Sequence, residues 1–93
     1  MMMNEQIKRI MQMESLLNAA LSLIKKDSLS PEEMQTLKQL VDQLDVYYSG
    51  PLWRMDYEAD EKGLLPRDLN RGVLSEDGIW NLLTDYTALL DEE

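Results

Sequence analysis

The stretch KKDSLSPEEM, residues 25–34, decides the fold because it ends one helix and begins the next. Ser30 can act as the N-cap of the second helix, and Pro31 takes the first helical position, where its missing N–H costs nothing. Glu33 completes a capping box by reaching back to the Ser30 amide. The two lysines that open the stretch suit the negative end of a preceding helix dipole. The link is short, which predicts an antiparallel helical hairpin.

Hydrophobic periodicity extends a helix on each side of this stretch, because apolar residues recur there every three or four positions. The first helix is expected over about residues 4–26 and the second over about residues 31–48, ended by Gly50 and Pro51. The apolar faces consist of Met3, Ile7, Ile10, Met13, Leu17, Ala20, Leu21 and Ile24 in the first helix, and of Leu37, Val41, Leu44 and Tyr48 in the second.

Residues 49–74 show no long hydrophobic period and predict short helical turns within an irregular segment. We expect a short helix near residues 51–61, closed at Gly63 by a left-handed residue, and a single turn that stops at Gly72. The inner face of the short helix would be Leu52, Met55 and Ala59. A last helix is expected over about residues 76–91, with Ser75 as its N-cap. Its apolar stripe consists of Ile79, Leu82, Leu83, Tyr86 and Leu90.

These elements predict one all-α domain over residues 1–93, in which the hairpin packs with the C-terminal helix much like a three-helix bundle. The core is small at this length, and Trp53 and Trp80 are expected to be its largest members. Three apolar residues of the first helix lie off its main stripe: Met11, Leu16 and Leu23. A face of that width suits a helix that touches a second copy of the chain, so a homo-oligomer is a second hypothesis.

Composition restricts the chemistry. The chain has no His and no Cys, which removes the commonest general base and the thiolate nucleophile, so we expect no enzyme and no catalytic or cofactor-binding residue. A net charge of −9 disfavours nucleic acid and anionic membranes as partners. No apolar run approaches the roughly 20 residues of a membrane-spanning helix, and the polar N-terminus does not resemble a signal peptide. A soluble, cytoplasmic protein is expected.

The carboxylates are distributed unevenly. Residues 75–93 carry six acidic and no basic side chains, which is typical of a solvated face but would also suit a basic partner, or a decoy that imitates nucleic-acid phosphates. The run from Asp56 to Glu61 resembles the start of a calcium-binding loop, but it has Glu61 and Arg67 where that loop needs Gly and Glu. A metal site or a carboxylate-based enzyme at Asp56, Asp60 and Asp68 therefore remains only a minor alternative.

The irregular segment gathers unusual residue types. Three of the four arginines, Arg54, Arg67 and Arg71, lie among its carboxylates, and we expect Arg–carboxylate pairs to hold the segment over the core. Every aromatic residue of the chain is Tyr or Trp, and these types, like Arg, are enriched in protein interfaces. The leading hypothesis is a protein-interaction or regulatory module that binds its partner through Tyr48, Trp53, Asp56, Tyr57, Asp60 and Arg71.

The same region carries a resemblance to a known family. The residues concerned are Tyr47 to Ser49, Trp53, Asp56 to Glu61, Gly63, Leu65-Pro66, Asp68-Leu69, Arg71 to Asp77 and Leu82-Leu83. With this pattern the chain resembles a family of small bacterial proteins, mostly from Gram-positive species, catalogued as a domain of unknown function. The run from Arg71 to Asp77 is the most specific part. The resemblance implies an all-helical cytoplasmic protein, and it carries over no catalytic or ligand-binding residue.

Overall fold

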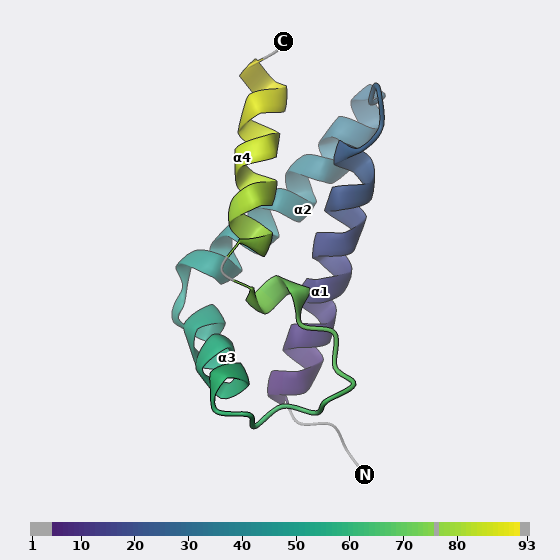
Figure 1. Cartoon of the computed structure of the whole chain (residues 1–93). Helices are drawn as coiled ribbons and strands as arrows, with labels where there is room; N and C mark the ends of the chain where they lie inside the picture. The colour runs from purple at the N-terminus through teal and green to yellow at the C-terminus, as the bar shows by residue number, and fades with distance from the viewer. Residues whose placement is uncertain (1–4, 76, 92–93) are drawn as a thin grey trace.

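The computed structural model describes residues 5–75 and 77–91, which form four α-helices and one short 3₁₀ helix (Figure 1). The helices are α1 (Glu5–Ile24), α2 (Pro31–Ser49), α3 (Pro51–Glu61), η1 (Gly72–Leu74) and α4 (Gly78–Asp91). These residues contain no strand, so the all-α prediction is confirmed. Helices α1 and α2 form the expected antiparallel hairpin, and α4 packs against both, whereas α3 lies near the start of α1 (Figure 1).

The link between α1 and α2 forms as the sequence predicts. The Glu33 amide donates to Ser30 Oγ at 3.1 Å, and the Ser30 amide donates to Glu33 Oε1 at 3.0 Å, which completes the capping box. Helix α1 ends at Ile24, two residues before the expected end. The reason is that the chain already turns at the two lysines, where Lys26 forms an ion pair with Glu33 across the link.

The core runs between α1, α2 and α4 and continues beneath η1. On α1 the predicted stripe supplies Ile10, Leu17 and Ala20, all buried, and on α2 the buried aromatic residue is Tyr47 rather than Tyr48. Trp80 was expected in the core but is 59% exposed, because α4 turns Ile79 and Leu82 inward instead. The buried apolar residues are Ile10, Leu17, Ala20, Leu37, Val41, Leu44, Tyr47, Ala59, Leu65, Val73, Leu74, Ile79 and Leu82.

A single residue, Gly50, joins α2 to α3 and forms an elbow in the chain. It is the C-cap of α2, where its N–H donates to the Tyr47 carbonyl, and it is also the N-cap of α3. Pro51 then occupies the first turn of α3. The close spacing fixes the direction of α3, because the helix has no connecting loop in which to change course.

The inner face predicted for α3 is right for Ala59, which is buried, and wrong for Leu52 and Met55, which are exposed. The other buried residue of α3 is Asp56. A charged residue faces inward here because the side chains of α1 and α2 supply hydrogen-bond donors to its carboxylate. Helix α3 ends at Glu61 and is closed, as predicted, by the left-handed residue Gly63, whose φ is 71°. The Gly63 and Leu64 amides donate to the carbonyls of Asp60 and Ala59, each at 3.0 Å, in a Schellman motif.

The chain then crosses below the start of α1 and returns to the core through η1 (Figure 1). The sequence prediction missed η1: a turn was expected to stop at Gly72, where this 3₁₀ helix begins. Helix α4 starts at Gly78, slightly later than expected, and Ser75 Oγ accepts a hydrogen bond from the Gly78 amide at 3.0 Å. Glycine is required there, since a Cβ at Gly78 would lie 2.5 Å from the Gly72 carbonyl oxygen.

Candidate functional site

Four polar side chains meet where α1, α2 and α3 converge, and we call them the Asp56 cluster: Gln6, Arg9, Tyr47 and Asp56. Tyr47 Oη donates to Asp56 Oδ2 at 2.6 Å, and Arg9 donates through Nε to Oδ2 at 2.9 Å and through Nη2 to Oδ1 at 2.5 Å. Gln6 Nε2 adds a fourth bond to Oδ1 at 3.0 Å. The Asp56 carboxylate is fully buried, and donors from two other helices surround it.

The surroundings of the Asp56 carboxylate set its ionisation. Burial alone would raise the pKa of Asp56, but the hydrogen bonds from Arg9, Tyr47 and Gln6 outweigh it, so that this pKa lies below its ordinary value. The hydrogen bond to Asp56 in turn raises the pKa of the Arg9 guanidinium. Burial, together with the bond to Asp56, raises the pKa of the Tyr47 phenol. The cluster is therefore a charged pair with a neutral phenol at neutral pH.

The Asp56 cluster ties α3 to the hairpin, and its carboxylate has no acceptor position left over for a ligand. Both carboxylate oxygens already accept two hydrogen bonds each. Asp56 was expected to pair with an arginine of its own segment, and this is wrong: its partner Arg9 lies 47 residues earlier, on α1. Arg54 and Arg67 are exposed.

A second polar anchor holds η1. The Val73 amide donates to Glu14 Oε1 at 2.7 Å, and the Val73 carbonyl accepts from Trp53 Nε1 at 3.0 Å. Side chains of α1 and α3 thus satisfy both backbone groups of a fully buried residue, as a buried backbone requires. The indole N–H of Trp53 is therefore hydrogen-bonded within the chain.

The six residues proposed as a binding face divide into three groups. Trp53 lies between two tyrosines, edge to face with Tyr48 at 4.9 Å and stacked on Tyr57 at 5.1 Å between ring centroids. Arg71 Nη1 lies 2.7 Å from Asp60 Oδ1, and this pair within the segment was predicted. Asp56 lies inside the protein and does not contribute to any surface.

The structure does not assemble the carboxylates of the metal hypothesis. Asp56 is enclosed by its donors, and Asp60 is paired with Arg71. Within residues 5–75 and 77–91, no three acidic side chains are placed so that they could hold a metal ion together.

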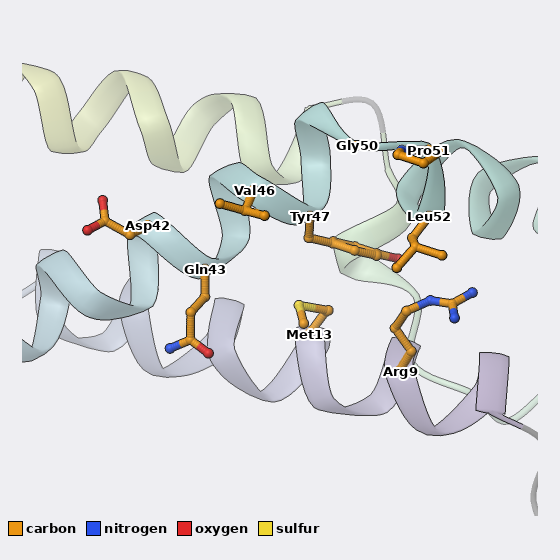
Figure 2. Close-up of a pocket in the computed structure, with 9 residues that line it drawn as sticks. All are labelled: Arg9, Met13, Asp42, Gln43, Val46, Tyr47, Gly50, Pro51 and Leu52. Carbon is orange, nitrogen blue, oxygen red and sulfur yellow. The ribbon is translucent and has the colours of Figure 1, made fainter.

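A groove opens beside the Asp56 cluster, between α1, the end of α2 and the start of α3. Its volume is about 600 Å³, and Figure 2 shows Met13, Val46, Tyr47 and Leu52 arranged around one space. Val46 is 74% exposed and Leu52 43%, although both are apolar. The groove is lined by Arg9, Met13, Asp42, Gln43, Val46, Tyr47, Gly50, Pro51 and Leu52.

Sequence reasoning missed this groove for a physical reason. Val46 lies off the apolar stripe of α2, and a single apolar residue among polar neighbours is common on protein surfaces. Its meaning depends on α3, which brings Leu52 beside it only because Gly50 turns the chain in one residue. The one available signal was the pair of apolar residues on either side of the Gly50-Pro51 elbow.

Comparisons with known proteins assign the chain to a family. No described helix is long and apolar enough to cross a membrane. No curated protein and no solved structure matches the sequence. A family model described as a domain of unknown function, DUF4298, matches residues 10–93. Because this match extends from the second turn of α1 to the last residue, the chain belongs to the DUF4298 family.

Proposed function

We propose that this protein is a non-catalytic, cytoplasmic protein-interaction module whose binding face is the groove between α1, α2 and α3. The observation that carries the proposal is the exposure of Val46 and Leu52 around an apolar hollow of about 600 Å³. Concave apolar surfaces with a few polar groups at the edge are the usual form of binding sites. A partner that covers the groove would remove both side chains from water, which favours association.

The groove replaces the face proposed from the sequence. The indole N–H of Trp53 is bonded to Val73, and Arg71 is bonded to Asp60, so both polar groups already have partners within the chain. Val46 and Leu52, by contrast, expose apolar surface at the edge of a hollow.

The occupant that fits best is a helical segment of a different protein. A second copy of the chain would bring another net charge of −9 to the contact, and this repulsion disfavours self-association. Helix α1 also offers less free apolar surface than its sequence indicates. Of the three residues off its main stripe, Leu16 and Leu23 pack against the core, and Met11 is exposed. A fatty acid is disfavoured because Arg9 is the one basic residue among the described lining residues, and its positive charge is balanced by Asp56.

Site-specific photo-crosslinking tests the proposal. A photoreactive amino acid replaces Val46 in one variant and Leu64 in a matched control, since Leu64 is 71% exposed but lies outside the groove. We expect the residue at position 46 to crosslink a defined second protein in the cells that produce this chain, and the residue at position 64 to give none of that product.

The crosslinked protein is then identified by mass spectrometry, purified, and tested for binding to the Val46→Gln and Leu64→Gln variants. Val46→Gln should weaken binding about tenfold, which corresponds to losing the burial of most of one valine side chain. Leu64→Gln should leave the affinity unchanged. A crosslink to another copy of the chain, equal products from both positions, or no product at position 46 would each contradict the proposal.

A further inference from the structure

We infer that the partner segment is a basic amphipathic helix, an inference that rests on the groove being the binding face. The dimensions of the groove support a helix of about two turns. Along α2 and its C-cap the lining runs from Asp42 to Gly50, a rise of about 12 Å at 1.5 Å per residue. Residues at positions i, i+4 and i+7 of a partner helix span about 10 Å and face one side, so that three apolar anchors fit this length.

The backbone around the groove favours a helix over an extended peptide. An extended segment must find hydrogen-bond partners for its own amides and carbonyls, usually at a sheet edge. Here the walls are helices, which bond most of their backbone groups internally and present no sheet edge, although they end at the elbow. At the elbow, the Gly50 N–H donates to Tyr47 and Pro51 has no N–H. A helix needs no such partners, because it satisfies its own backbone.

The charges around the groove favour cationic flanks on that helix. Among the described lining residues Arg9 is the only basic one, and its guanidinium is engaged by Asp56. Asp42 lines the groove in an exposed pair with Lys38, and the exposed Glu5, outside the lining, lies one helical turn before Arg9 on α1. The whole chain adds a net charge of −9, which draws a cationic partner towards it and repels an anionic one.

Three synthetic helices test the inference with the intact protein. Each has about 18 residues, because isolated helices shorter than about 12–15 residues are marginal in water, and each carries leucines at i, i+4 and i+7. Their remaining exposed positions are lysine, glutamine or glutamate. Binding is measured by fluorescence anisotropy at about 0.01 M salt and again at about 1 M salt, where charges are screened beyond about 3 Å.

We expect the lysine helix to bind at least about tenfold more tightly than the glutamate helix at low salt, with the glutamine helix between them. The difference should fall below about threefold at high salt, because it is electrostatic. Val46→Gln should lower the affinity for the lysine helix about tenfold, and Leu64→Gln should leave this affinity unchanged. This dependence on Val46 separates docking in the groove from unspecific attraction to an acidic protein.

A matched pair of charge variants locates the attraction. Asp42→Asn removes a carboxylate from the groove and frees Lys38, whereas Asp85→Asn removes an exposed carboxylate of α4. Both variants change the net charge by one. Asp42→Asn should lower the affinity for the lysine helix by about two- to fivefold, in keeping with an exposed charge pair. Asp85→Asn should lower this affinity less. Equal effects would show that only the overall charge acts, and would contradict the inference.

The remaining outcomes distinguish this inference from the proposed function. If all three helices bind equally and all depend on Val46, the basic partner is wrong and the groove is still the binding face. If the lysine helix binds as well to Val46→Gln as to the unchanged protein, the inference fails and the groove also loses its support as a binding face. If no helix binds, a helical partner is excluded, and the crosslinking experiment decides on the groove separately.

Discussion

The two ends of the molecule are held together by different forces. At one end, α1, α2 and α4 pack against one another through buried aliphatic residues such as Leu37, Leu44 and Leu82. At the other end, the Asp56 cluster and the bonds to Val73 fix α3 and η1. A short helix has little apolar surface to bury, so specific hydrogen bonds determine where it lies.

The polar end is also where the groove forms. Arg9 and Tyr47 belong to the Asp56 cluster and line the groove at the same time (Figure 2). The position of Leu52 depends on how α3 is seated, and the cluster seats it. The apolar end should therefore govern the overall stability of the protein, and the polar end should govern both stability and the shape of the binding face.

The largest effect is expected from Asp56→Ala. The substitution leaves the Arg9 guanidinium and the Tyr47 hydroxyl without their shared acceptor, and breaking a buried pair in this way costs about 3–5 kcal/mol. Arg9 retains partial exposure, so the lower end of that range is expected. Urea unfolding measures the change. The control is Asp60→Ala, whose ion pair with Arg71 is about a third exposed and should contribute below about 1 kcal/mol. Equal losses would remove the distinction between the two pairs.

The apolar end should respond to Leu82→Ala with a loss of about 3 kcal/mol, because the side chain is fully buried and its removal leaves a cavity. Leu90→Ala on the same helix is the control, since Leu90 is exposed and should cost below about 1 kcal/mol. The groove should keep its affinity for the lysine helix in Leu82→Ala under folding conditions. A loss of affinity comparable to that of Val46→Gln would show that the two ends are not separable.

A smaller effect is expected from Glu14→Ala, about 2 kcal/mol, because the buried Val73 amide would lose its acceptor. Glu14→Gln retains a carbonyl oxygen at the same place and should recover about half of the loss. Chemical denaturation gives both values, and amide hydrogen exchange at Val73 should accelerate in the alanine variant. A glutamine variant as unstable as the alanine variant would mean that the charge, not the hydrogen bond, holds η1.

The smallest effect is expected on the stability of the protein at acidic pH. The folded pKa of Asp56 lies below its unfolded value of about 3.9, so its stabilising contribution is complete above that value and is lost as the pH falls through the folded pKa. Stability should therefore decrease more steeply below about pH 4 in the unchanged protein than in Asp56→Asn, which has no proton to take up at this position. Urea midpoints at neutral pH and near pH 3 test this. Parallel decreases in both proteins would contradict the assignment.

The sequence predicted the apolar end well and the polar end poorly, and the difference is physical. Periodicity places Ile10, Leu17 and Leu44 on core faces, because apolar residues three or four positions apart share one side of a helix. The capping box at Ser30 was equally predictable, since its partners lie three residues apart. Asp56 was misjudged because its four hydrogen bonds come from residues up to 50 positions away. No local pattern identifies such partners.

The groove was unpredictable for a related reason. Val46 and Leu52 become neighbours through one glycine elbow and through a helix whose seating depends on the buried aspartate. The sequence drew attention to the aromatic and arginine side chains between residues 48 and 71. In the structure Trp53 contacts Tyr48, Tyr57 and the Val73 carbonyl, and Arg71 is bonded to Asp60. Residue types that are common in interfaces are equally useful for holding an irregular segment in place.

The most direct test of the account is a titration of isotopically labelled protein with the lysine helix, followed by amide chemical shifts. The groove predicts that the largest changes appear at Met13, Val46 and Leu52, while the exposed indole of Trp80 on α4 keeps its position. Changes concentrated at Trp80 instead, with the groove amides unmoved, would contradict the groove as the binding face.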